Sequence, residues 1–185
     1  MDAVFVHNQM QMFVEQVDAN MYGKSVSELT TNEYNAMLAG FINGIVEEEG
    51  LTHVEQCETD AVTTAQRLHV AFSDLWSRKW EQGLSDLAVI GSSVPELLSD
   101  CKGSAQDIAT LEEWATVFMS PSTLPSVIKY NVAHKKIKLS RDLLKARSEW
   151  NSETEYFEFG TTLGEMLVIG TQPIPADSEL YEMEF

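Results

Sequence analysis

The side chains best suited to chemistry in this 185-residue chain are four histidines and two cysteines. The histidines are His7, His53, His69 and His134. None lies three or four residues from another, and no Glu-x-x-His pattern accompanies them, so a ferritin-type metal site is not indicated. Cys57 and Cys101 form no C-x-x-C pair, which argues against a zinc ribbon or a thioredoxin-type motif. The sequence therefore predicts no metal site.

Nucleotide-binding and hydrolase motifs are also missing from the sequence. The stretches Gly23–Ser25 and Lys102–Ser104 lack the upstream glycine that a phosphate-binding loop requires. No Gly-x-Ser-x-Gly pattern occurs. Acidic residues are too numerous for one pair to stand out as an acid–base couple. We expect no catalytic residues and no cofactor, and hence a protein that is not an enzyme.

The chain is strongly acidic, with 29 Asp and Glu against 12 Lys and Arg and a formal net charge of −17. Such a surface repels nucleic acid and anionic membranes, so we expect neither as a partner. It keeps the protein soluble or attracts a basic partner or divalent cations. Seven of the twelve cations lie between Lys129 and Arg147, where they are expected to answer acidic faces of this chain or of a second copy. No apolar run approaches the length of a membrane span.

Apolar residues recur every three or four positions along most of the chain, which indicates helices. The predicted helices cover about 8–21, 31–49, 53–77, 81–101, 104–118, 124–149 and 153–169. The sequence thus predicts an all-α bundle of six or seven helices in a single domain, 1–185, with extended terminal arms at 1–7 and 171–185.

Local signals refine three of these predicted helices. Thr30 or Thr31 is the expected N-cap of the second helix. Pro95, just after Gly91, Ser92 and Ser93, predicts a kink in the helix that ends near Cys101, or a break with Ser93 as a new cap. Ser152 and Glu155 have the spacing of a capping box for the last helix.

Two pairs of glycines interrupt helices at a spacing of one turn. Gly40 and Gly44 lie in the second predicted helix, and Gly160 and Gly164 in the last. A glycine inside a helix costs about 1 kcal/mol relative to alanine. We therefore expect a neighbouring helix to pack very closely there. The alternative is an apolar ligand that approaches the backbone between these helices.

The two cysteines lie at matched positions of a predicted antiparallel hairpin, about 53–101, whose turn falls near Lys79. Each cysteine is 22 residues from that turn, so each arm is roughly 33 Å long and both cysteines reach the same height. A disulfide there closes a long loop and contributes on the order of 4 kcal/mol. The alternative is a pair of buried free thiols. A disulfide predicts an extracellular or organelle-lumen location, or the mitochondrial intermembrane space; free thiols predict the cytoplasm.

Several weak motifs in a fixed order resemble those of a largely uncharacterised family of small secreted protist proteins. They are Gly40-Phe41-x-x-Gly44, Cys57, Gly83-Leu84, Leu87, Gly91, Asp100-Cys101-Lys102, Trp114, Phe118, Pro121, Asn131, His134 and Phe159-Gly160-x-x-Leu163-Gly164. The resemblance spans about residues 36–169. It implies one disulfide, a helical fold and secretion, the last requiring a signal peptide removed before Met1. It supplies no catalytic residues.

Aromatic residues mark the places where a partner is expected to dock. Trp76 and Trp80 flank the predicted hairpin turn, four residues apart, and such a pair either caps the core or docks a partner. The predicted arms carry apolar side chains outside the helical pattern, namely Val4, Phe5, Ile174, Tyr181 and Phe185. Arms of this kind are exchanged between chains in oligomers or fold back on their own domain. The sequence favours a non-enzymatic structural or interaction protein, a unit of a homo-oligomer or larger complex. The alternative is a carrier for a lipid-like or other apolar ligand.

Overall fold

A computed structural model shows a helical protein and describes residues 24–46, 61–98 and 123–175. In these ranges the chain forms five α-helices and a short 3-10 helix, without a strand, which confirms the all-α class. The elements are η1 (Val26–Glu28), α2 (Thr31–Val46), α3 (Ala61–Trp76), α4 (Trp80–Leu98), α6 (Leu124–Asn151) and α7 (Tyr156–Thr171). Five is fewer than the six or seven predicted helices; the predicted helices at 8–21 and 104–118 lie outside the described residues.

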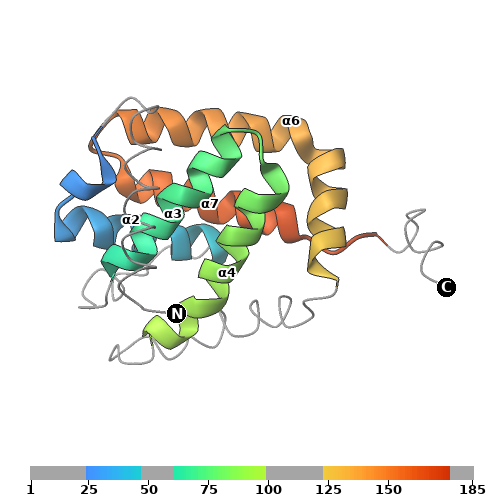
Figure 1. Cartoon of the computed structure of the whole chain (residues 1–185), viewed down its shortest axis with the longest axis horizontal. Coiled ribbons are helices and arrows are strands. Elements are labelled where there is room, and N and C mark those ends of the chain that lie inside the picture. The colour runs from blue at the N-terminus through green and yellow to red at the C-terminus, as the bar shows by residue number, and fades with distance from the viewer. Residues whose placement is uncertain (1–23, 47–60, 99–122, 176–185) are drawn as a thin grey trace, which may run out of the picture.

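Helix α7 is the centre of the bundle (Figure 1). Eleven of its 16 residues are buried, and it packs mainly against α2 on one side and α6 on the other. Helices α3 and α4 form an antiparallel pair that covers α2, α6 and α7. Phe72, Trp150 and Phe159 are among the largest side chains of the shared core, and the ring of Phe159 contacts the other two. No helix in the described ranges is both long and apolar enough to cross a membrane.

Helix α2 begins with a reciprocal capping box. The backbone N–H of Glu33 donates to Oγ1 of Thr30 at 3.3 Å, and the backbone N–H of Thr30 donates to the Glu33 carboxylate at 2.6 Å. Thr30, rather than Thr31, is therefore the cap. The Thr30 hydrogen bond, assisted by Lys24 at 3.0 Å, holds the pKa of Glu33 below its usual value, although partial burial opposes this shift.

Helices α2 and α7 touch backbone to backbone through the four glycines at one-turn spacing. A Cβ atom at Gly40 would overlap the carbonyl oxygen of Phe157, and one at Gly160 would overlap that of Met37. Gly44 and Gly164 face each other one turn further along, again within contact distance of the opposite backbone. Only residues without a side chain allow two helices to approach so closely.

Helices α3 and α4 are joined by a three-residue turn, Ser77–Lys79, at the position that the sequence indicates. The N–H of Lys79 donates to the carbonyl of Asp74 at 2.9 Å, and that of Arg78 donates to Leu75 at 3.0 Å. These two bonds define a Schellman motif, which requires a left-handed residue at its centre. Arg78 supplies that conformation with φ of 63°.

Helix α4 continues through Pro95 to Leu98, so the predicted break with a new cap at Ser93 is wrong. The proline ring removes one N–H from the helix ladder. The hydroxyl of Ser93 instead donates to the carbonyl of Ile90 at 2.7 Å, within the same turn.

Helix α6 is bent at Lys135, whose backbone is not helical (φ −115°, ψ 17°). Figure 1 shows the two arms, 124–134 and 136–151, at a steep angle to each other. The amide of Asn131 donates to the carbonyl oxygens of Gly170 and Gln172 at 3.2 and 2.8 Å, and Lys135 donates to the side chain of Gln172. The end of α7 therefore holds the first arm in place.

The turn between α6 and α7 differs from the predicted capping box. Helix α7 begins at Tyr156, and its N-cap position is occupied by Glu155. Ser152 instead ends α6: its hydroxyl donates to the carbonyl of Glu149 at 2.7 Å and accepts from the backbone N–H of Glu155 at 3.1 Å. Glu153, between them, has φ of 60°. Residues 153–155, which the sequence predicts to be helical, therefore form a turn in which Glu153 is left-handed.

Candidate interaction surface

Trp76, at the end of α3, packs inside the molecule. The guanidinium of Arg147 lies 4.1 Å from the centre of its ring, and Phe72 contacts it at a centroid distance of 6.5 Å. Arg147 belongs to the second arm of α6. The cation–π contact therefore ties the α3–α4 hairpin to α6, and most of the Trp76 ring is used for internal packing.

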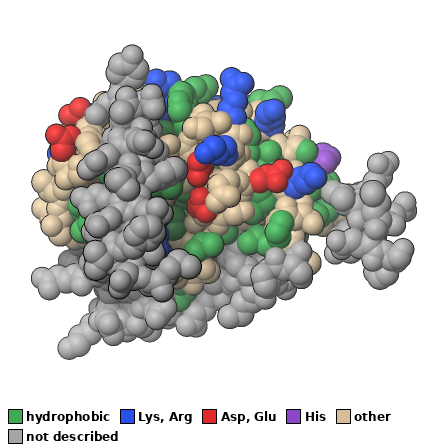
Figure 2. Space-filling model, viewed as in Figure 1, with side chains coloured by type: hydrophobic (Ala, Val, Ile, Leu, Met, Phe, Trp, Pro, Cys, Tyr) green, Lys and Arg blue, Asp and Glu red, His purple; other side chains and the backbone are tan. Residues whose placement is uncertain are grey.

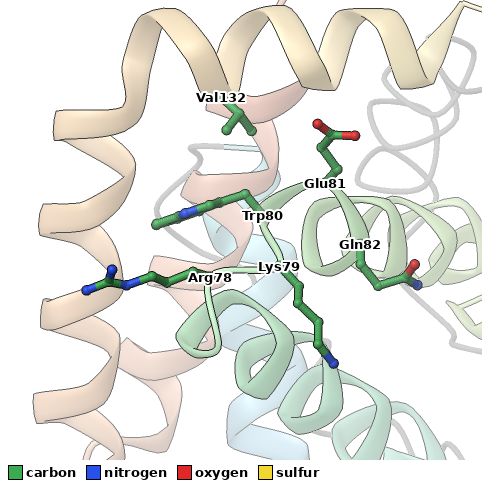
Figure 3. Close-up of a pocket in the computed structure, with 6 residues that line it drawn as sticks. All are labelled: Arg78, Lys79, Trp80, Glu81, Gln82 and Val132. Carbon is green, nitrogen blue, oxygen red and sulfur yellow. The ribbon is translucent and has the colours of Figure 1, made fainter.

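Trp80, at the start of α4, lines a pocket that is open to solvent and has a volume of about 680 Å³. Figure 3 shows Trp80 and Arg78 extending from the turn, with Val132 of α6 across the pocket. Lys79 is drawn away from this group, since it pairs with Asp74 at 3.0 Å. The pocket thus offers an aromatic ring and a valine side by side, bordered by the cation of Arg78.

A second exposed apolar feature lies on α6, and we call it the α6 outer face. Ile137 is 81% exposed and Leu144 is 61% exposed. They are seven residues apart, so they lie on one side of the helix, and Arg141 lies between them on the same side. Lys138 and Lys145, both exposed, flank this face. Blue and green side chains accordingly lie together in Figure 2 along the edge where α6 runs.

Positive charges lie close together on α6, and the pKa of Lys135 reflects this. Burial lowers the pKa of the Lys135 ammonium, and the nearby charge of Lys138 lowers it further. The only internal ion pair described for this face joins Lys145 to Glu149 at 3.6 Å. The seven cations between Lys129 and Arg147 are therefore not neutralised by an equal number of carboxylates in the described part of the chain.

The opposite charge gathers where η1 meets the α6–α7 turn, and we call this region the acidic end. Burial raises the pKa of the Tyr156 hydroxyl to about 12, and the negative charges of Glu33, Glu153 and Glu28 raise it too. These carboxylates come from three different elements. Glu155 and Glu158 are exposed beside them at the start of α7. Figure 2 shows red side chains at this end, away from the bend of α6.

Several polar side chains lie in the interior of the described part of the chain. Burial raises the pKa of Glu149, while a hydrogen bond from Thr162 at 2.8 Å and the charge of Lys145 oppose that shift. The His69 ring is fully buried, 4.5 Å from that of Trp150. His134 is exposed and stacks on Tyr130, so it does not share the buried environment of Asn131 as the helical spacing suggests. Among the described residues, no three metal-binding side chains converge.

The predicted site residues have different outcomes. Gly40, Gly44, Gly160 and Gly164 meet in one helix contact, as described above. Ile174 is half-buried in the extended segment that follows α7. The two cysteines and most of the predicted arm contacts lie outside the described residues; they are Cys57, Cys101, Val4, Phe5, Tyr181 and Phe185.

Sequence reasoning missed the α6 outer face, because it assigned Ile137 and Leu144 to the apolar content of a long helix. The signal lies in the angular positions of Ile137 and Leu144 around the helix. The core stripe of the second arm is Leu139, Leu143 and Ala146, and Ile137 lies about 160° around the helix from Leu139 at 100° per residue. Two apolar residues opposite the core stripe indicate an exposed apolar face.

No protein-family model matches the chain, and no curated protein or solved structure matches it either. The resemblance to secreted protist proteins therefore stays a prediction.

Proposed function

We propose that this protein is a non-enzymatic structural or interaction protein, a helical unit of a homo-oligomer or larger complex. The supporting observation is the α6 outer face, where Ile137 and Leu144 project into solvent at 81% and 61% exposure. Both are opposite the core stripe of α6, so neither is needed to pack the fold. Removing an exposed apolar side chain from water favours association by roughly 25 cal/mol per Å² of buried area.

The pocket beside Trp80 is the second contact surface in this proposal. It joins the hairpin turn to α6 through Val132, and the α6 outer face begins five residues further along the same helix. A tryptophan next to an arginine is typical of the residues that dominate the binding energy of interfaces. Trp76 contributes indirectly, because its ring helps to hold the hairpin against Arg147.

The test of this proposal is the native mass of the protein isolated from its source. We expect a species heavier than the 20.7 kDa chain, and its dissociation when Leu144→Ser is introduced. Val89→Ser is the matched control, since Val89 on α4 is also 61% exposed but lies outside the α6 outer face. A protein that is a single 20.7 kDa chain at every concentration and in its source would contradict the proposal.

The carrier alternative places an apolar ligand between the glycine-bearing helices. At those four positions the space next to each glycine is occupied by the backbone of the opposite helix. A drug-sized ligand needs a cavity of at least about 300 Å³. No described observation favours a cavity there, and we therefore do not propose the carrier function.

The proposed compartment depends on the two cysteines. We propose an extracellular or organelle-lumen location, with the mitochondrial intermembrane space as an alternative, because a disulfide persists only in an oxidising compartment. The measurement is the mass of the intact protein before and after reduction and alkylation. We expect two cysteines that become alkylated only after reduction. Alkylation of both without reduction would favour the cytoplasm.

A further inference from the structure

The α6 outer face and the acidic end are complementary in charge and in apolar character. The face carries Lys138 and Arg141 beside Ile137 and Leu144. The acidic end carries exposed Glu153, Glu155 and Glu158, with the partly buried ring of Phe157 between them in sequence. The two surfaces therefore have opposite charges, and each has an apolar side chain that the contact can bury.

The two surfaces cannot meet within one molecule. The second arm of α6 leads directly into the turn that holds Glu153, so the helix fixes the separation between the α6 outer face and the carboxylates of that turn. Ile137 lies 14 residues before the end of α6, which corresponds to about 21 Å along the helix axis. A rigid helix cannot fold back to shorten that distance, so the contact requires a second molecule.

Charge also decides how two copies can pair. A symmetric pair of α6 outer faces would oppose the same cations, and like charges at an interface are strongly unfavourable. Two acidic ends would repel each other for the same reason. An asymmetric pairing opposes cations to carboxylates, and it can repeat, because each copy retains one unused surface of each kind.

We infer that the occupant of the α6 outer face is the acidic end of a second copy of this chain, arranged head to tail. This inference rests on the proposed function and specifies its partner. Repetition of a head-to-tail contact closes into a ring or extends as a filament, according to the rotation between copies. Because the contact joins exposed charges, raised salt weakens it.

The experiment uses two variants of the full chain that each remove one surface. The face variant carries Lys138→Glu and Arg141→Glu; the end variant carries Glu153→Lys and Glu155→Lys. Arg67→Glu with Lys129→Glu is the matched control for the face variant, since it makes the same change in net charge at exposed positions outside both surfaces. Far-UV circular dichroism verifies the fold of each variant, and sedimentation velocity reports its mass.

We expect the unmodified protein and the control to form a concentration-dependent series of oligomers, and each variant alone to be a monomer. An equimolar mixture of the two variants should associate again, because the intact acidic end of the face variant can pair with the intact face of the end variant, and the two charge-reversed surfaces are also complementary to each other. A mixture that stays monomeric, or a variant that still associates alone, overturns the inference.

Failure of the inference is distinguishable from failure of the proposed function. If Leu144→Ser dissociates the assembly but both charge variants still associate alone, the α6 outer face is a contact and the acidic end is not its partner. If the unmodified protein is a monomer when purified yet part of a larger complex in its source, the head-to-tail inference is wrong and the proposed function stands.

Discussion

The α2–α7 contact and the α6 outer face are both helix surfaces, but they differ in the space that they leave for side chains. At the first, four glycines let two backbones touch, and a single added carbon has no room. At the second, Ile137 and Leu144 extend into solvent with no neighbour that would resist their removal. One surface is closed by the fold, and the other is left open by it.

This difference separates the residues that the fold requires from those it does not. Substitution at the glycine contact moves two helices apart and affects every layer of the core. Substitution on the α6 outer face changes only what the molecule presents to others. Large apolar residues that lie together at exposed positions are typical of an interaction surface.

Gly160→Ala tests the closed surface and has the largest expected effect. The new Cβ would overlap the carbonyl oxygen of Met37, a backbone atom that cannot rotate away. We expect a loss of about 3 kcal/mol in the free energy of unfolding, which lowers Tm by roughly 6–12 °C. Thermal and urea denaturation measure both quantities.

Gly83→Ala is the control for that variant. A Cβ at Gly83 would lie 2.6 Å from the side chain of Leu75 and 2.9 Å from the carbonyl oxygen of Ala71, against 2.0 Å from the Met37 carbonyl at Gly160, so we expect a smaller loss. Equal stability of Gly160→Ala and the unmodified protein would show that α2 and α7 are not in backbone contact.

Leu139→Ala and Ile137→Ala compare buried and open positions on the same helix. Leu139 is fully buried, and its truncation should cost about 2–5 kcal/mol of unfolding free energy. Ile137 is 81% exposed, and its truncation should change stability by no more than about 0.5 kcal/mol. Urea denaturation at pH 7 measures both. Similar losses for the two variants would mean that Ile137 is covered, which would remove the basis of the α6 outer face.

The part of this contrast that sequence could predict is the part set by local spacing. Glycines one turn apart predict close helix packing, and the apolar pattern predicts the α3–α4 turn near Lys79. The pattern could not predict that the two glycine pairs meet each other, because helical spacing describes a surface and not its partner. Pro95 misled for a related reason: its effect depends on how far the helix continues.

The bend of α6 was equally beyond prediction from local sequence. No proline or glycine lies next to Lys135, so no helix-breaking residue predicts the bend. The contacts that hold the first arm come from Gly170 and Gln172, about 40 residues further along the chain. The exposure of Ile137 and Leu144 depends in turn on which side of the second arm faces α7, and that choice is made by the tertiary packing.

The carboxyl groups of Glu33 and Glu149 affect stability with opposite dependence on pH. Hydrogen bonding lowers the pKa of Glu33, so its contribution to stability is present above the unfolded pKa near 4.5 and is lost as pH falls through the folded value. Burial raises the pKa of Glu149, so its ionisation costs stability as pH rises above 4.5. The exposed capping carboxylate stabilises the fold when charged, and the buried one stabilises it when neutral.

The variants Glu33→Gln and Glu149→Gln should therefore differ in sign. At pH 7 we expect Glu33→Gln to lower the urea midpoint, and Glu149→Gln to leave it unchanged or raise it, since a glutamine can still accept the bond from Thr162. As pH falls, the difference for Glu149→Gln should shrink first, because the raised pKa of Glu149 means that it is protonated earlier, and the difference for Glu33→Gln should shrink only when the pH passes below its lowered pKa. A lower midpoint for Glu149→Gln at pH 7 would mean that its pairing with Lys145 outweighs the cost of burial.

The smallest expected effect is at the hairpin turn that borders the open pocket. Arg78 has φ of 63°, and the left-handed conformation costs a residue with a Cβ roughly 1–2 kcal/mol. Arg78→Gly removes that cost but gives the unfolded chain more freedom, so we expect a net gain of about 0.5–1 kcal/mol in unfolding free energy. Arg78→Ala separates the two causes, because it removes the same charge and keeps the Cβ. Stability should rise with glycine and not with alanine; equal changes would assign the effect to the charge beside Trp80. In either case the turn keeps its Schellman bonds, so a change in association of Arg78→Ala without a change in its stability would report on the pocket alone.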